Sequence, residues 1–281
     1  MELSPETVRL AAFITGLGLF YVVESLLAHR PWHSPRGRRL ALHAGLAILN
    51  SVILRLAVAG PLLYLAQYVT EREIGIVPWI GVVGWSEVVA TVIVLDMADY
   101  WWHRLNHRIP FLWRFHQVHH VDTHVDVTTS LRFHFGELLL SGIAKAIWIV
   151  VWGPSLWGFA LFELSVSLAS QYHHSNIDYP DWLEPAVRAV NVTPRMHASH
   201  HSALTHTLNA NFSTVLSVWD RMFGTFARPT DADLRVMGLR YGRERDLELG
   251  YLLALPFRTP PDAWESTRRS VDDVPGGAPR G

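Results

Sequence analysis

The sequence predicts an all-α, polytopic integral membrane protein, a bundle of about four or five spans with a cytoplasmic, histidine-rich helical catalytic cap. Of the 281 residues, 49% are hydrophobic and only 17% are charged. Soluble domains usually carry about 25% charged residues. Several apolar stretches are long enough to cross a bilayer, which takes about 20 helical residues. The histidines, 16 in all, are concentrated beyond these first stretches.

Four apolar stretches are the candidate membrane spans. They are Val8 to Ala28, Leu40 to Val69, Ile76 to Met97, and Leu138 to Ala169. The last stretch is interrupted at Gly153-Pro154, so it forms either two short spans or a broken helical hairpin. Polar side chains inside the stretches, Asp96 among them, are expected to face the bundle interior.

The arginines predict the orientation of the chain in the membrane. The connection "HRPWHSPRGRR", after the first stretch, holds four arginines, whereas "TEREIG", after the second, holds one. Because positive loops stay in the cytoplasm, the first connection is cytoplasmic. Counting spans forward then places every histidine cluster on the cytoplasmic face. The expected location is therefore integral and multi-pass, with the histidines inside.

Three regions follow from this order. Residues 1–100 are the N-terminal transmembrane helices, and residues 101–230 are a catalytic region that includes a transmembrane hairpin near 136–170. Residues 231–281 form a C-terminal tail that is partly disordered, because its end is rich in Pro, Gly and charge. A net charge of −1 provides no basic field for nucleic acid. The absence of cysteine excludes disulfides and Cys-ligated iron-sulfur clusters.

Four histidine clusters carry the chemistry. They are "HRLNH" at 103–107, "HQVHH" at 116–120, "YHHSN" at 172–176 and "HASHH" at 197–201. On a helix, positions i and i+4 share a face, so each spaced cluster presents several imidazoles in one direction. Neutral imidazole nitrogens suit Fe, Zn, Cu and Ni. The clusters therefore predict metal binding rather than isolated, hydrogen-bonded histidines.

The number of imidazoles predicts two metal ions. Eight histidines lie in the three tightest clusters, and His173 or His174 is a ninth. This exceeds the roughly four ligands of a zinc site. Two ions with about four or five imidazoles each account for the number, and an all-nitrogen shell favours redox-active iron. A zinc protease is disfavoured, because "HRLNH" lacks the glutamate that would act as general base.

At these clusters the sequence resembles the fatty acid hydroxylase superfamily, also called the sterol desaturase family. Its members are integral membrane di-iron oxygenases marked by H-x3-H, H-x-x-H-H and a second H-x-x-H-H. "YWWHRLNH" resembles the first motif, and "LWRFHQVHHVDTHVDVTTSLRFH" the second with the segment that follows it. "QYHHSNI" resembles a weaker third motif and "TPRMHASHH" the last. "NANFSTVLSVWDRMFGTF" resembles the closing signature, so the similarity covers residues 95–226.

The resemblance implies a specific set of site residues. The metal ligands would be His103, His107, His116, His119, His120, His174, His197, His200 and His201. His173 either replaces its neighbour or adds a tenth donor. His134 and Asn211 are expected near the site. Asp96 lies seven residues before His103 on the same helical face, where it either orients a ligand imidazole or bonds to a neighbouring helix.

Two departures from the family pattern touch the expected substrate-facing rim and leave the metal ligands intact. Ser213 follows the Asn-aromatic pair where relatives carry Gly, and "RFHFGE" lacks the usual Pro. They therefore blur the identity of the substrate more than the type of reaction.

The implied activity is oxidation of a lipid C–H bond with O2, giving an alcohol or an alkene. The cofactor would be two Fe ions, and the lipid would enter from the bilayer. A separate electron-donor protein, ferredoxin-like or cytochrome b5-like, would be needed, because the chain has no Rossmann glycine motif and no cysteine for a cluster. The alternative is a histidine-rich membrane metal-binding protein or transporter without redox chemistry.

Overall fold

Long helices form the body of the protein in the computed structural model, which describes residues 5–258. They are α1 (Pro5–Leu26), α2 (Arg36–Leu54), α3 (Gly60–Glu71), α5 (Gly84–Arg108), α7 (Phe135–Trp152) and α8 (Leu156–His174). No β-strand occurs within residues 5–258, where the pairing between extended segments is limited to two isolated bridges. The all-α prediction is confirmed for this part of the chain.

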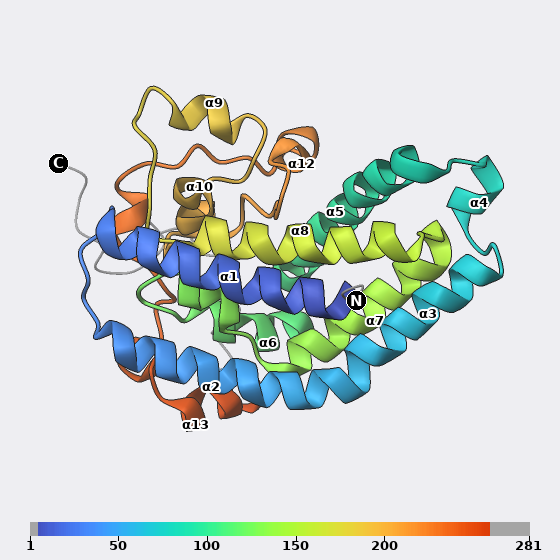
Figure 1. Cartoon of the computed structure of the whole chain (residues 1–281). Helices are drawn as coiled ribbons and strands as arrows, with labels where there is room; N and C mark the ends of the chain where they lie inside the picture. Colours follow the sequence, from blue (N-terminus) through green and yellow to red (C-terminus); the bar gives the residue numbers. More distant parts are fainter. Residues whose placement is uncertain (1–4, 259–281) are drawn as a thin grey trace.

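The short elements gather at one end of the long helices. They are α6 (Pro110–His120), η2 (Val127–Leu131), α9 (Glu184–Arg188), α10 (Pro194–His200), α11 (Thr205–Leu208), α12 (Val218–Met222), η3 (Asp233–Arg235), η4 (Arg243–Arg245), α13 (Leu249–Ala254) and η5 (Leu255–Phe257). Figure 1 shows α9, α10, α12 and α13 at this end, while the short α4 (Ile76–Ile80) closes the opposite end. The bundle therefore has a capped end, where most of the short elements lie, and an opposite end that is closed by α4.

The break expected at Gly153-Pro154 separates α7 from α8. Gly153 has a φ of 71°, and a Cβ at this position would lie 2.1 Å from the carbonyl oxygen of Ile74. Only glycine fits such a left-handed, crowded turn. The two helices, of 18 and 19 residues, both pack against α3 and α5.

The second and third apolar stretches differ from their expected boundaries. The second is not one straight helix, because α2 and α3 are joined by a π-helical turn, η1 (Arg55–Ala59), and the two pieces are bent by 53°. The third is divided between α4 and α5 by Gly81 and Gly84, which both have positive φ. The new helix then continues to Arg108 and carries the first pair of clustered histidines.

By length and composition, one helix within residues 5–258 is apolar enough to cross a membrane alone, α7. The bent pair formed by α2 and by α3 with α4 would count as a second if it is one span, and Leu10–Leu26 is a shorter apolar helix. The predicted four or five spans are therefore more than these helices show by themselves.

Buried charges fasten α1 and α2 to the capped end. The guanidinium of Arg39 donates to both carboxylate oxygens of Asp122, at 2.7 and 2.9 Å, and to Asp126 at 2.7 Å. On α1, the Glu24 carboxylate accepts the backbone N–H groups of Val127 and Asn176. These bonds fix the segment after the second histidine cluster and the last residue of the third.

The start of the expected C-terminal tail is folded onto the cap. Leu252 and Leu255 are buried in a cluster with Leu46, Trp113 and Val118, so residues 249–257 cover α6. The Pro- and Gly-rich stretch from residue 259, on which the expectation of disorder rested, lies outside the described residues.

Candidate metal centre

Four helices deliver the clustered imidazoles to one place at the capped end. His103 and His107 lie near the end of α5, and α6 begins directly afterwards with Pro110, which has no N–H to lose at the first helical position. In α10, the Thr193 side chain caps the N-terminus by accepting the N–H of Met196. The third cluster occupies the last turn of α8.

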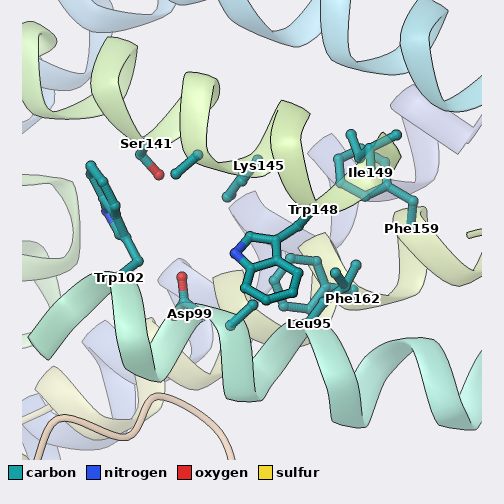
Figure 2. Close-up of a pocket in the computed structure, with 11 residues that line it drawn as sticks. Leu95, Asp99, Trp102, Ser141, Lys145, Trp148, Ile149, Phe159 and Phe162 are labelled. Carbon is teal, nitrogen blue, oxygen red and sulfur yellow. The ribbon is translucent and has the colours of Figure 1, made fainter. Parts of the chain in front are cut away.

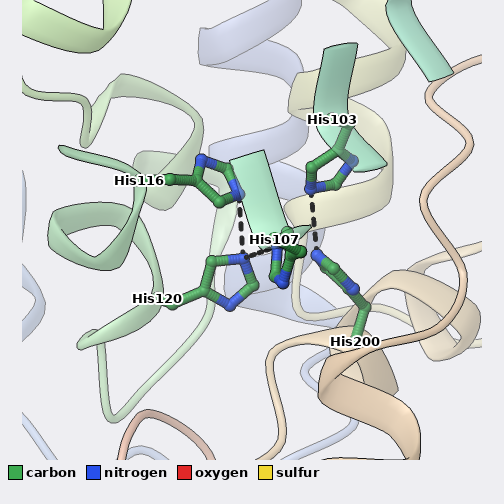
Figure 3. Close-up of side chains that lie close together, drawn as sticks. All are labelled: His103, His107, His116, His120 and His200. Atoms are coloured by element: carbon green, nitrogen blue, oxygen red, sulfur yellow. Dashed lines mark hydrogen bonds between the residues drawn. The ribbon is translucent and has the colours of Figure 1, made fainter. Parts of the chain in front are cut away.

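Nine histidines form two groups in which the ligand nitrogens lie within 4.8 Å of one another. The five-imidazole group is His103, His107, His116, His120 and His200, and the four-imidazole group is His119, His174, His197 and His201. Figure 3 shows the five-imidazole group, with side chains from three helices pointing toward a common centre. His103 is partly buried and the other eight are buried.

Each H-x-x-H-H motif is divided between the two groups. His116 and His120, four residues apart, join the five-imidazole group, while His119 between them joins the other. In α10 the pair His197 and His201 enters the four-imidazole group, and His200 enters the five. This follows from helical phase, because residues at i and i+4 share a face and the residue at i+3 is rotated away from that direction.

The Nε2 atoms within each group are in near contact. In the five-imidazole group, Nε2 of His200 is 3.0 Å from that of His103, and Nε2 of His120 is 3.1 Å from those of His107 and His116. In the four-imidazole group, Nε2 of His174 is 3.0 Å from those of His119 and His197. The His201 and His197 Nε2 atoms are 3.2 Å apart.

Two of these pairs cannot be ordinary hydrogen bonds between neutral rings. Nδ1 of His103 donates to the Phe212 carbonyl at 2.8 Å, and Nδ1 of His200 to the Ala210 carbonyl at 2.7 Å. Since a neutral imidazole has one N–H, both Nε2 atoms then carry lone pairs that face each other. Lone pairs at this separation repel unless a cation lies between them.

The same arrangement recurs in the four-imidazole group. Nδ1 of His119 donates to the Arg132 carbonyl at 3.2 Å, and Nδ1 of His174 to the Ser170 carbonyl at 2.6 Å. Protonation does not relieve either pair, because burial lowers the pKa of His200 to about 3 and that of His174 to about 4. The donor set therefore fits two metal cations, one in each group.

A carboxylate that the sequence analysis did not single out contacts this site. Oε1 of Glu137, in the first turn of α7, lies 2.7 Å from Nδ1 of His116. His134 caps the same helix, because its Nδ1 accepts the N–H of Gly136. Metal-bound histidines commonly donate their second N–H to such a carboxylate. The sequence signal for it is an acidic residue in the first turn of a mostly apolar helix.

The Asp96 carboxylate hydrogen-bonds to backbone and indole N–H groups rather than to an imidazole. Its carboxylate accepts the backbone N–H groups of Val215 and Leu216 and the indole N–H of Trp219. The carboxyl group that contacts a clustered imidazole is that of Glu137. Asp96 therefore bonds to a neighbouring segment, the second of the two roles considered for it.

Asn211 and His173 lie beside the groups. Asn211 has a φ of 59°, a left-handed conformation that Asn tolerates, and it separates the two carbonyl groups that accept from His200 and His103. Its side chain bonds to Ser199 and to the backbone of Ala227. His173 is outside both groups, and its Nδ1 lies 3.1 Å from the Thr214 carbonyl.

A cavity of about 370 Å³ opens against both groups. Its lining includes His103 and His116 from one group, and His119 and His174 from the other. This volume lies in the ~300–1,000 Å³ range of small-molecule sites. The nitrogens of both groups therefore border one space that a substrate can fill.

A small, mostly apolar slot of about 20 Å³ adjoins the cavity between α5, α7 and α8. Asp99, Trp102, Ser141 and Lys145 line both spaces. Figure 2 shows Trp102 and Ser141 at one end of the slot and aromatic and aliphatic side chains at the other, which are Leu95, Trp148, Ile149, Phe159 and Phe162. At about 20 Å³ the slot has room for a single water-sized molecule, so an apolar chain would enter it only if these side chains moved apart.

Comparisons with known proteins agree with this site. Residues 88–225 match the family described as Fatty acid hydroxylase, a stretch that contains every clustered histidine. The alkylglycerol monooxygenase of Danio rerio is 34% identical over 137 residues, which are 49% of this chain and 30% of the relative. The ornithine lipid hydroxylase of Rhizobium tropici is 30% identical over 54% of this chain and 46% of its own length.

A methylsterol monooxygenase of Arabidopsis thaliana is 28% identical over 64% of this chain and 68% of the relative. The matched part of the chain spans less than half the length of the first two relatives. No solved structure gives a significant match. The family match and these relatives, together with the histidine motifs, show that the chain belongs to the fatty acid hydroxylase superfamily.

Proposed function

We propose that this protein is a membrane-bound di-iron oxygenase that uses O2 to hydroxylate a C–H bond of a lipid. Desaturation of the same bond is the variant outcome. The observation that carries the proposal is the pair of facing Nε2 lone pairs in each group, between His103 and His200 and between His119 and His174. An all-nitrogen donor set of this size suits redox-active iron.

The named activities of the relatives support the type of reaction. Alkylglycerol monooxygenase, ornithine lipid hydroxylase and methylsterol monooxygenase are all named for oxidation of lipids. They differ in the lipid, so the shared part is oxygenation of a lipid C–H bond. The expected partner is a separate electron donor, ferredoxin-like or cytochrome b5-like.

Membrane insertion is supported by the outer surface of the long helices. Side chains such as Ile14, Ile48, Ile143 and Ile147 are between 59% and 67% exposed. Exposed apolar side chains spread over several helices favour contact with lipid rather than water. We therefore retain a multi-pass arrangement with about four or five membrane crossings as part of the proposal.

Exposed tryptophan side chains lie near the α4 end of the bundle. Trp79, Trp85 and Trp157 are 85%, 78% and 60% exposed, and all three lie at or near the α4 end. Tryptophan is enriched at membrane interfaces. Trp157 and His174 lie roughly 26 Å apart along α8, close to the ~30 Å of a bilayer's hydrocarbon core. The arginine-rich connection lies at the histidine end, which favours a cytoplasmic metal centre.

The protein's own residues would hold and orient the reacting parts. Nine imidazoles would hold the two irons, and carbonyl groups together with Glu137 would fix the imidazole tautomers. The irons would supply O2 activation and oxidation of the C–H bond. The cavity of about 370 Å³ beside the imidazoles would bind the reacting part of the lipid and exclude water.

The experiment combines metal analysis with lipid analysis. Purified wild-type protein should contain about two irons per chain and oxidise an added lipid in an O2-dependent reaction. Lipid extracts of a host that lacks the chain should regain the product with wild type but not with His119→Ala. His206→Ala, a change at a histidine that is outside both groups, is the matched control.

The alternative is metal binding without redox chemistry. It predicts one zinc ion per chain, no O2 uptake and identical lipid profiles in the presence and absence of the chain. The groups lie at helix ends rather than midway along the long helices, which disfavours a transport path.

A further inference from the structure

A second large cavity lies away from the two histidine groups. Its volume is about 520 Å³, and the residues that line it include none of the grouped imidazoles. It is bounded by the connection between α1 and α2, by the segment after α6, and by residues around η3 and η4. The polar side chains in its lining include Arg30, His33, His124, Asp231, Arg235 and Arg243.

The lining has an excess of positive charge. Three arginines, Arg30, Arg235 and Arg243, and one carboxylate residue, Asp231, line the cavity. Arg30 and Arg243 also donate to backbone carbonyl groups. This carboxylate is shared with another cation, because its Oδ1 lies 3.7 Å from Nη1 of Arg195. Arginine presents a planar set of N–H donors that matches the oxygens of phosphate. The charge balance favours an anionic ligand.

His124 gives a second, independent indication of a ligand. The residue is 4% exposed, and its Nε2 is buried without a hydrogen-bond partner. Its ring packs against Trp32, with ring centroids 5.0 Å apart. Buried polar atoms in native proteins nearly always have a partner, so a ligand in this cavity would satisfy the imidazole.

The position of the cavity indicates where the ligand comes from. His29 and Arg30 begin the connection three residues after the end of α1, an apolar helix that the proposed arrangement places in the bilayer. The opposite wall contains Met237 and is bonded to the backbone of a grouped histidine. The N–H of the next residue, Gly238, donates to the His201 carbonyl at 2.9 Å. The cavity thus lies at the depth where a membrane phosphate and a soluble one are both accessible.

We propose that this cavity is a binding site for a phosphate group, carried either by an anionic lipid headgroup or by a soluble phosphorylated molecule. The ligand's oxygens accept from the arginines that line the cavity, and His124 completes the contact. Occupancy holds residues 231–243 against α10, which carries His197 and His200 and is followed directly by His201. This site is independent of the proposed oxidation and holds whether or not the metal centre is redox-active.

The test uses the full chain in phosphatidylcholine nanodiscs with its metal bound. One arm titrates inorganic phosphate and measures the dissociation constant by calorimetry. The other arm adds phosphatidylglycerol to the nanodisc and counts retained lipid by native mass spectrometry. Arg235→Gln is the test variant, and Arg240→Gln, on the same segment but outside the lining, is the matched control.

Saturable binding of either probe, weakened about tenfold or more by Arg235→Gln and unchanged by Arg240→Gln, supports the proposal, because one charge-assisted contact is lost. The arm that responds identifies the source of the phosphate. If neither probe binds wild type, or if both variants weaken binding equally, the proposal fails.

Hydrogen exchange on wild type keeps the test decisive if Arg235→Gln does not fold. The responding probe should slow exchange in residues 231–243 and in residues 29–33. Unchanged exchange in both segments would overturn the proposal.

Discussion

The two imidazole groups are similar in ligand type but differ in what holds their rings. In the five-imidazole group, His116 lies against the Glu137 carboxylate, while His103 and His200 donate to carbonyl groups. In the four-imidazole group, His119 and His174 donate to carbonyl groups. The first group therefore has a negative charge one ring away from its centre, and we expect it to hold its cation more tightly.

The largest expected effect separates two adjacent histidines. His174→Ala should remove one of two metal ions per chain and lower O2-dependent lipid oxidation to background, because His174 is a member of the four-imidazole group. His173→Ala should retain both ions, since its ring lies outside both groups. Metal analysis and product formation on the two purified variants check this. Equal loss of metal in both would refute the division.

The second prediction removes the charge that distinguishes the groups. Glu137→Gln should weaken metal binding at the five-imidazole group by about 10–100-fold, the usual cost of losing such a partner. Competition with a calibrated chelator measures this affinity. Glu163→Gln, which changes a carboxylate that is paired with Lys145 and belongs to neither imidazole group, is the control and should leave metal affinity unchanged.

The two groups should also differ in how fast they lose their metal ions to a chelator. A chelator should strip the wild-type protein in two phases. The four-imidazole group should empty first, because within residues 5–258 none of its imidazoles is bonded to a carboxylate. The faster phase should disappear in His119→Ala. A single phase, or loss of the slower phase in that variant, would contradict the expected order.

The last prediction concerns how the stability of the metal-free protein depends on pH. The pKa values of His200 and His174, about 3 and about 4, lie below the ordinary 6.5, because burial disfavours the charged ring. The unfolded chain then binds more protons than the folded one below pH 6.5. Stability should therefore be full above that pH and decline as the pH falls toward these values. Denaturant unfolding of the metal-free protein measures the decline, and a flat profile would disagree.

The sequence predicted the candidate ligands because their spacing is a local property. An i, i+4 pair such as His103 and His107 lies on one helical face wherever that helix packs. The sequence does not predict which histidine belongs to which group, because this depends on how α6 and α10 pack against α5 and α8. From spacing alone, each H-x-x-H-H triplet is expected to point in one direction, whereas the structure divides both triplets between the two groups.

The supporting residues show the same limit. Asp96 was expected beside an imidazole or a neighbouring helix, and its bonds go to the segment after Asn211. Glu137 was missed because no spacing rule links it to His116, twenty-one positions away. The bend at η1 and the break near Gly84 were missed for a similar reason, since composition alone reads these stretches as continuous apolar helices.

The most direct test of two metal ions in two groups is anomalous diffraction from crystals of iron-loaded protein, measured at the iron absorption edge. The account predicts two anomalous peaks, one among His103, His107, His116, His120 and His200, and one among His119, His174, His197 and His201. A single peak, or two peaks outside these groups, would contradict it.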